Sequence, residues 1–190
     1  DELIQLIDAD TDAFKLVRED IKTNLVKDIF SRSEIQREVV TNFDKKCRAY
    51  IEVQNGCDHR CTYCVIPYAR GNNISIPFGN IVKQAQLIVE QGYNEIVLTG
   101  VDITNYGSDL PGYPKLGNIV TRLLKLCPDL QRLRLSSIDV AEIDEELLEL
   151  MKYESRLMPH FHISVQSGDD MILKRMKRRH SSQDMIDFCA

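Results

Sequence analysis

The sequence predicts an α/β protein with parallel strands, and three observations support this class. A short apolar run at residues 95–100 is typical of a strand buried on both faces of a sheet, and residues 132–139 and 160–166 are predicted to be the next two strands. Stretches with helical periodicity lie before and between these strands, at 80–91, 117–126 and 144–152. Strands and helices thus alternate along the chain, and this order favours parallel strands joined by right-handed crossovers.

The first predicted strand leads directly into a run of cysteines. Residues 50–54 alternate apolar and polar side chains, and Asn55-Gly56 then breaks the pattern. Cys57, Cys61 and Cys64 follow, separated by three residues and then by two. We therefore expect the thiols just beyond the carboxyl end of a strand, the edge at which parallel α/β folds bind ligands.

The number of cysteines restricts the chemistry of this loop. Three thiolates are one too few for a closed structural zinc site, which normally takes four ligands. They suit a [4Fe-4S] cluster with one iron left open, although the spacing differs from the common ferredoxin run. A zinc site completed by His59 or by a distant residue remains an alternative. A disulfide framework is disfavoured, because three cysteines cannot all pair among themselves.

The run Cys57-Asp58-His59-Arg60-Cys61-Thr62-Tyr63-Cys64 resembles the C-x3-C-x2-C signature of the radical S-adenosylmethionine (SAM) enzymes. The resemblance implies that the three cysteines hold a [4Fe-4S] cluster whose open iron binds SAM. It also implies cleavage of SAM to an adenosyl radical that abstracts hydrogen from a substrate. The protein would supply binding, orientation and exclusion of water. An electron donor of the flavodoxin or ferredoxin type is an expected partner.

Two further runs narrow the resemblance to methylthiotransferases, which add sulfur and a methyl group to tRNA adenosines or to a ribosomal protein. These are Cys64-Val65-Ile66-Pro67-Tyr68-Ala69-Arg70-Gly71 and Leu98-Thr99-Gly100-Val101-Asp102. The second run resembles the branch that acts on N6-threonylcarbamoyladenosine next to the tRNA anticodon. The alternatives are the same chemistry on isopentenyladenosine tRNA or a ribosomal protein, and a non-catalytic zinc or RNA-binding module.

The resemblance also implies cofactor contacts at the carboxyl ends of the predicted strands. Gly100 fits either a close backbone approach to a ligand or only a turn. Ser136 fits either a hydrogen bond to ligand or a cap for the next helix. The expected cofactor contacts are Tyr63, Thr99, Gly100, Val101, Ser136, Gln166 and Ser167.

Basic residues near the end of the chain predict a contact with RNA phosphates. Five Lys or Arg side chains fall within seven positions at 174–180, and a helix there would turn them outward. The alternative is a solvated helix face, and for Arg70 it is a surface salt bridge. The net charge of −5 argues against broad nucleic-acid binding by this chain alone. The expected RNA contacts are Arg70, Lys174, Arg175, Lys177, Arg178 and Arg179.

The resemblance begins at Arg48 and divides the chain into two parts. Residues 1–46 are expected to be the helical tail of an N-terminal methylthiotransferase domain plus a linker. Residues 47–190 are expected to form an incomplete (β/α)6 partial TIM-like barrel, so we expect the chain to be part of a larger protein. No apolar run reaches membrane-spanning length, and we expect a cytoplasmic protein with no membrane partner.

Overall fold

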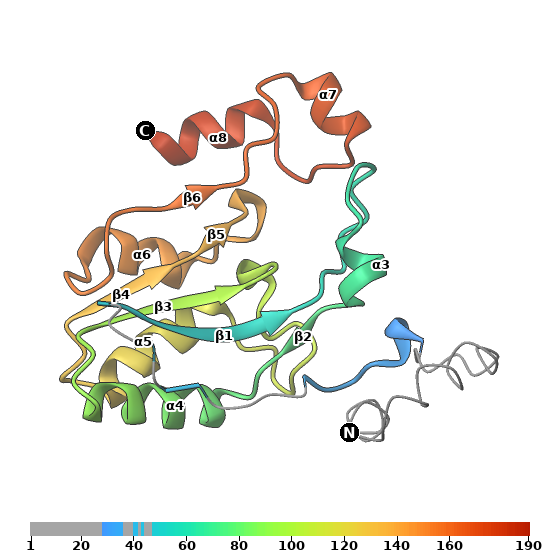
Figure 1. Cartoon of the computed structure of the whole chain (residues 1–190). Helices are drawn as coiled ribbons and strands as arrows, with labels where there is room; N and C mark the ends of the chain where they lie inside the picture. Colours follow the sequence, from blue (N-terminus) through green and yellow to red (C-terminus); the bar gives the residue numbers. More distant parts are fainter. Residues whose placement is uncertain (1–27, 36–39, 42, 44–46) are drawn as a thin grey trace, which may run out of the picture.

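The computed structural model describes residues 28–35, 40–41, 43 and 47–190, and its centre is a mainly parallel sheet. Strands β1, β3 and β4 are parallel neighbours, and the short β2 pairs antiparallel with β1, which gives the order β2-β1-β3-β4. A second parallel pair, β5 with β6, continues in the same direction (Figure 1). The strands are β1 Ala49–Asn55, β2 Ile74–Ser75, β3 Glu95–Gly100, β4 Arg132–Leu135, β5 Ser137–Ile138 and β6 His162–Ile163.

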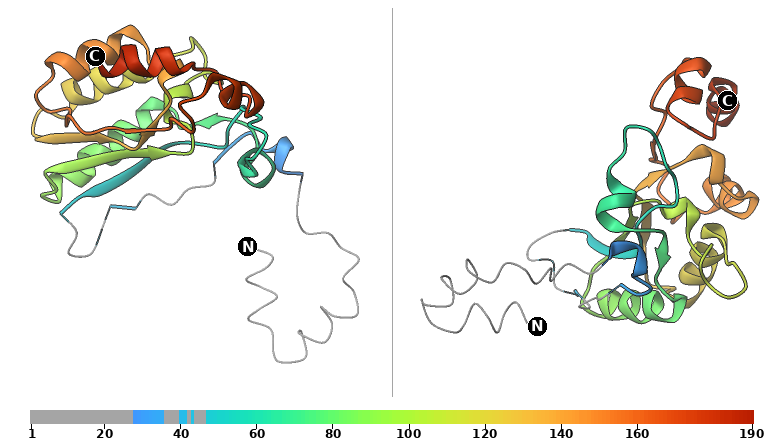
Figure 2. Two further views of the ribbon diagram at one scale, coloured as in Figure 1. Left: turned by 90° about the horizontal axis from the view of Figure 1, so that it is seen from above. Right: turned by 90° about the vertical axis from the view of Figure 1, so that its right-hand side faces the viewer.

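Three helices cover one face of this sheet (Figure 2). They are α4 Phe78–Glu90, α5 Leu116–Leu126 and α6 Glu145–Tyr153, and they follow β2, β3 and the β4–β5 region along the chain. The remaining helical segments are α3 Ile66–Arg70, α7 Asp170–Arg175, α8 Ser182–Cys189 and the 3-10 turns η1 Ile29–Ser31, η2 Ile103–Asn105 and η3 Val140–Glu142. The alternation of strand and helix confirms the predicted α/β class, whereas the antiparallel β2 was not predicted.

The core lies between the sheet and these helices. Ile51, Ile96 and Leu98 of the strands are fully buried, as are Ile88 of α4 and Leu123 of α5. Burial of each such side chain contributes roughly 1.5–3 kcal/mol relative to exposure. This packing fixes the carboxyl ends of β1 and β3 relative to each other, and the cysteines follow β1 at that edge. No helix within the described ranges has the length and apolar character needed to cross a bilayer.

The predicted strand at 132–139 is interrupted. Its ladder breaks at Ser136, whose N–H donates to the carbonyl of Leu98 at 3.0 Å. Beyond this residue β5 leaves the first sheet and pairs with β6. The predicted strand at 160–166 is likewise shorter, since β6 pairs only with the two residues of β5, and Gln166 then turns the chain with a φ of 64°. The edge where the parallel strands end is therefore shared by the four-stranded sheet and the short β5–β6 pair.

The helix predicted across the basic run ends at Arg175, so that part of the prediction is wrong. Lys177 adopts a left-handed φ of 57°, and its N–H donates to the carbonyl of Lys174 at 3.1 Å. The N–H of Arg178 reaches back to the carbonyl of Leu173 at 2.9 Å. This pair of bonds is the Schellman pattern that stops a helix. The basic side chains consequently do not share one helical face.

The described part of the predicted linker packs against the end of α4. The rings of Phe43 and Tyr93 pack edge to face with their centroids 5.8 Å apart, and the N–H of Phe43 donates to the Tyr93 hydroxyl at 3.0 Å. Gln84 donates to the carbonyl of Val40 at 2.8 Å. Residues 1–27 of the predicted helical tail lie outside the described residues, and the boundary at residue 46 stays a prediction.

Candidate metal centre

All three cysteines of the loop face one cavity of about 190 Å³. The cavity lies beyond the carboxyl ends of β1, β3 and β5, and Cys57 is buried while Cys61 and Cys64 are partly exposed. None of the three forms a disulfide with a described residue. The N–H of Cys57 donates to the carbonyl of Gly71 at 3.1 Å, and the N–H of Cys64 donates to that of Cys61 at 3.0 Å.

Gln54, the buried residue near the end of β1, ties the cysteine loop to the loop after β3. Its Nε2 donates to the carbonyl of Gly56 and to Oδ1 of Asn73, both at 2.6 Å. Its Oε1 accepts the N–H groups of Val101 at 3.0 Å and Asp102 at 2.8 Å. One side chain therefore sets the spacing between the two loops that line the cavity.

Gly56 is required where the chain leaves β1. It has a φ of 73°, and a Cβ there would lie 1.9 Å from the carbonyl oxygen of Asn72. Only glycine avoids both the left-handed strain and this overlap. The break predicted from Asn55-Gly56 is thus a tight turn that directs Cys57 into the cavity.

The cavity also holds an ion-paired histidine. His59 Nε2 lies 2.9 Å from Asp102 Oδ2 and 3.2 Å from Glu142 Oε1. The hydrogen bond to Asp102, followed by that to Glu142, raises the pKa of His59 to about 10, despite the opposing effect of burial. Its imidazole is therefore a cation held between two carboxylates.

The surroundings of Cys57 favour its neutral thiol. Burial, followed by the charge of Asp102 at 3.5 Å from the sulfur, raises the pKa of Cys57 to about 12. Since metal ions and clusters bind the thiolate, loading of this site must release a proton.

Two ligand sets are therefore possible at this edge. Ligand atoms of Cys57, His59 and Asp102 lie within 4.8 Å of one another, close enough to hold one metal ion. However, Nε2 of His59 is already in contact with the carboxylates of Asp102 and Glu142. The three thiols face the same cavity, are unpaired and leave room for a fourth, non-protein ligand. This donor set fits a [4Fe-4S] cluster with one open iron better than it fits zinc.

Among the predicted cofactor contacts, Tyr63, Val101 and Gln166 line the cavity, whereas the others do not. A Cβ on Gly100 would lie 2.6 Å from the carbonyl oxygen of Gln54, so this glycine serves protein packing. Ser167 Oγ accepts the N–H of Asp169 at 3.1 Å. The remaining two are Thr99, which is partly exposed at the end of β3, and Ser136, whose buried Oγ has no hydrogen-bond partner in the described part of the chain.

The predicted RNA contacts separate into three groups. Arg178 lines the cavity, where it pairs with Asp139, and this burial contradicts its predicted place on an outer helix face. Arg179 pairs with Glu142 at 2.6 Å. The others are exposed and form no ion pair with any described residue, and they are Arg70, Lys174, Arg175 and Lys177.

Three acidic residues in or next to the cavity were missed by the sequence prediction. Asp102 and Asp139 each lie one or two residues beyond a strand, at the edge where the cysteines lie, and that position was an available signal. Glu142 lies in a 3-10 turn whose approach to His59 depends on the tertiary fold. No local pattern in the sequence indicates this contact.

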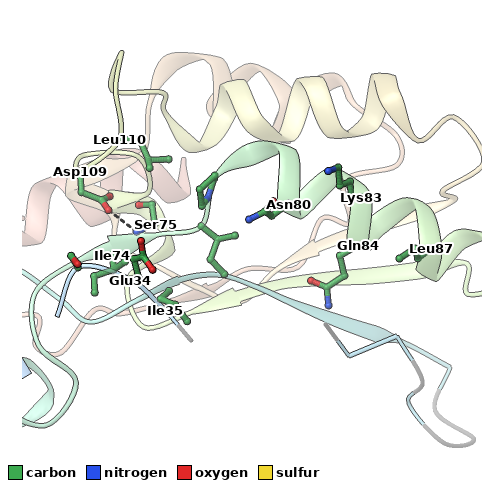
Figure 3. A pocket seen from close by; sticks show the side chains of 13 residues that line it. Glu34, Ile35, Ile74, Ser75, Asn80, Lys83, Gln84, Leu87, Asp109 and Leu110 are labelled. Atoms are coloured by element: carbon green, nitrogen blue, oxygen red, sulfur yellow. Dashed lines mark hydrogen bonds between the residues drawn. The ribbon is translucent and has the colours of Figure 1, made fainter. Parts of the chain in front are cut away.

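A larger cavity lies away from the cysteines. It has a volume of about 790 Å³ and lies between β2, α4 and residues 33–35 (Figure 3). Its polar side chains include Glu34, Asn80 and Lys83, and Asp109 accepts the N–H of Ser75 at 2.8 Å. No cysteine or histidine lines it among the described residues, whereas three cysteines and His59 line the smaller cavity.

Comparison with known proteins places this geometry in a family. The sequence profile of the Radical SAM superfamily matches residues 51–190, which include the cysteine loop and every strand that follows it. The chain therefore belongs to the Radical SAM superfamily.

Individual relatives agree with this assignment. The chain is 61% identical over 164 residues to the threonylcarbamoyladenosine tRNA methylthiotransferase MtaB of Rickettsia prowazekii, covering 86% of this chain and 39% of the relative. It is 39% identical over 140 residues to the tRNA-2-methylthio-N(6)-dimethylallyladenosine synthase of Erythrobacter litoralis, covering 73% and 31%. The chain thus spans about two fifths or less of the length of these relatives.

A solved structure shows the same fold at low sequence identity. The radical SAM methyltransferase TsrM of Kitasatospora setae, solved with cobalamin and a [4Fe-4S] cluster, aligns with a TM-score of 0.59 and 17% identity. The alignment covers 74% of this chain and 28% of that chain. The likeness confirms the architecture predicted for the radical SAM core.

Proposed function

We propose that this chain is the radical SAM core of a tRNA methylthiotransferase that acts on N6-threonylcarbamoyladenosine. The observation that carries the proposal is the convergence of Cys57, Cys61 and Cys64 on one cavity at the carboxyl edge of the sheet. The substrate is inferred from the 61% identity to a relative that is named for it. A substrate of this kind also favours a cytoplasmic location.

In this proposal, Cys57, Cys61 and Cys64 hold a [4Fe-4S] cluster. When bound, the cluster and SAM supply radical chemistry that removes hydrogen from the substrate. Tyr63, Val101 and Gln166 lie where they would contact the SAM molecule, and the loop tied by Gln54 keeps Val101 in place. An external electron donor of the flavodoxin or ferredoxin type completes the set of partners.

Exposed cations outside the cavity are the remaining candidates for RNA contacts. Arg70 ends α3, whereas Lys174 and Arg175 lie in the last turn of α7 and Lys177 is the second residue beyond it. Because the cysteine loop is joined to Met176 by the N–H of Thr62 at 3.2 Å, the two groups of cations flank the cavity. We expect them to add a salt-dependent contribution to tRNA affinity.

Anaerobic reconstitution with iron and sulfide tests the cluster. We expect a brown protein with about four irons per chain, and loss of the chromophore in Cys57→Ser, Cys61→Ser or Cys64→Ser. Cys189→Ser is the matched control, because this cysteine is exposed on α8 and does not line the cavity. A colourless protein that carries zinc, or a Cys61→Ser variant that keeps its iron, would contradict the proposal.

The substrate is tested separately by nucleoside mass spectrometry. Transfer RNA from a strain that lacks the gene should lose the 2-methylthio form of threonylcarbamoyladenosine and keep that of isopentenyladenosine. The reverse pattern would assign the chain to the other class of tRNA relative. If both modifications are retained in full, tRNA methylthiolation by this protein is excluded.

A further inference from the structure

Besides His59, the cysteine cavity buries a second cation, Arg178. Its side chain is 8% exposed, and Nη2 contacts the carboxylate of Asp139 and donates to the carbonyl of Ser164 at 3.1 Å. Nη1 points the other way and lies 3.7 Å from the sulfur of Cys61. The guanidinium therefore connects the end of β5 to one of the three predicted cluster ligands.

The backbone fixes this position from two sides. The Schellman turn at the end of α7 reverses the chain at Lys177, so Arg178 is directed inward. On the other side, Thr62, the neighbour of Cys61, donates its N–H to the carbonyl of Met176 at 3.2 Å and its hydroxyl to that of Arg175 at 3.3 Å. The turn that carries Arg178 is thus bonded directly to the cysteine loop.

Two simpler roles for Arg178 explain less of this geometry. A phosphate contact would need an exposed guanidinium, whereas this one is buried and already paired with Asp139. A role limited to the salt bridge with Asp139 would explain the position of Nη2, but it would not explain why Nη1 points toward the sulfur of Cys61. A planar guanidinium is suited to such a task, since it can donate to a carboxylate on one side and to a sulfur on another.

We propose that Arg178 is a positioning residue for the cluster: its guanidinium donates a hydrogen bond to the sulfur of Cys61 and makes the cluster easier to reduce. Hydrogen bonds to cluster sulfurs and nearby positive charge are known determinants of cluster potential. This inference rests on the proposed function, because it requires a cluster on the three cysteines.

The test compares Arg178→Gln with Lys177→Gln in the reconstituted protein. Both substitutions remove one positive charge from the same turn, but Lys177 is exposed and does not line the cavity. The readouts are the midpoint potential in an anaerobic redox titration and the electron paramagnetic resonance spectrum of the reduced cluster. We expect Arg178→Gln to shift the equilibrium about tenfold toward the oxidised form, which is ~59 mV for one electron. Lys177→Gln should keep the wild-type potential.

The possible outcomes separate the two proposals. A wild-type protein that binds no iron overturns the proposed function and with it this inference. A wild-type cluster with equal potentials in Arg178→Gln and Lys177→Gln overturns the inference alone. Should Arg178→Gln lose its cluster, Arg178→Lys decides, since one ammonium keeps the charge but cannot serve both Asp139 and Cys61. A lower potential or loss of iron from folded Arg178→Lys supports the role of Arg178, and a wild-type potential and spectrum reject it.

Discussion

At the residue scale, the turn at Gly56 directs the chain of Cys57 into the cavity, whereas the backbone reversal at Lys177 directs Arg178 into it. The spacing of Cys57, Cys61 and Cys64 indicated one shared cavity, and the structure brings all three to it. Arg178 was predicted as an outward-facing RNA contact because a run of cations looks the same whether or not the helix continues. Its burial depends on a backbone reversal at Lys177 that a lysine does not favour.

Gly100 offers a test of close packing at the edge of the cavity. A Cβ there would lie 2.6 Å from the Gln54 carbonyl oxygen and 2.9 Å from both Gln54 Oε1 and Ile103 Cγ2. We expect Gly100→Ala to lower the free energy of unfolding by about 1–3 kcal/mol through overpacking. Chemical denaturation followed by circular dichroism measures this.

Gly79 provides the matched control for that substitution. It lies inside α4, and a Cβ there would meet nothing within 4 Å. Gly79→Ala should therefore stabilise the protein by about 0.5–1 kcal/mol, because alanine loses less backbone entropy in a helix. Equal effects of the two substitutions would show that the contacts of Gly100 with Gln54 do not constrain this edge.

At the element scale, strongly periodic segments were predicted well and short ones were not. The strand predicted at 95–100 matches β3 Glu95–Gly100, and the helix predicted at 117–126 differs from α5 by one residue. The strand predicted at 160–166 pairs only at β6 His162–Ile163, since its partner β5 has two residues. Pairing length is set by the partner strand, which local sequence does not specify.

Substitutions near the end of α7 can measure how much stability is lost because Lys177 adopts a left-handed backbone conformation. Lys177 occupies the position that glycine normally takes in a Schellman turn. We expect Lys177→Gly to raise the free energy of unfolding by roughly 0.5–1 kcal/mol, since glycine adopts a positive φ without steric strain. Lys174→Gly, inside α7, should lower it by about 1 kcal/mol. Thermal denaturation of both variants separates these effects, and destabilisation by Lys177→Gly would refute the prediction.

Asp144 joins two helices through one carboxylate. Oδ1 accepts the N–H of Leu147 at 2.9 Å and caps α6, while Oδ2 accepts the N–H of Gly117 at 3.0 Å near the start of α5. Asp144→Ala should cost about 2 kcal/mol of stability, the upper range for a helix cap, because two N–H groups lose an acceptor. Asp144→Ser keeps one acceptor and should cost about half as much by urea denaturation. If the serine variant is as unstable as the alanine variant, the cap on α6 contributes little.

At the scale of the whole molecule, the alternation of strand and helix was sufficient to predict the class of the fold. The antiparallel β2 was not predicted, because its two residues carry no periodicity and follow a glycine turn. The opposite edge of the sheet is held by a charge cluster that also escaped prediction. Glu95 at the start of β3 pairs with Arg48, which precedes β1, and with Arg132 and Arg134 of β4.

This cluster predicts how the stability of the whole sheet depends on pH. Burial by itself raises the pKa of Glu95, but hydrogen bonds from Arg132 and Arg134 outweigh it and hold the pKa below the ordinary value of a glutamate. A carboxyl group with a lowered pKa in the folded state contributes stability above its unfolded pKa of about 4.3. This contribution is lost as the pH falls through the folded pKa, when the carboxylate takes up a proton.

Glu95→Gln isolates that contribution. At pH 7 we expect the variant to be about 2 kcal/mol less stable, because three arginines lose a charged acceptor. The difference in stability between variant and wild type should shrink as the pH is lowered below about 4.3. Below this pH the glutamate of the unfolded chain takes up a proton, while Glu95 in the folded chain is still charged. Urea denaturation at several pH values measures it, with Glu149→Gln on the exposed face of α6 as the control. A difference that stays constant down to the acid limit would show that the pairs joining β1, β3 and β4 do not depend on the charge of Glu95.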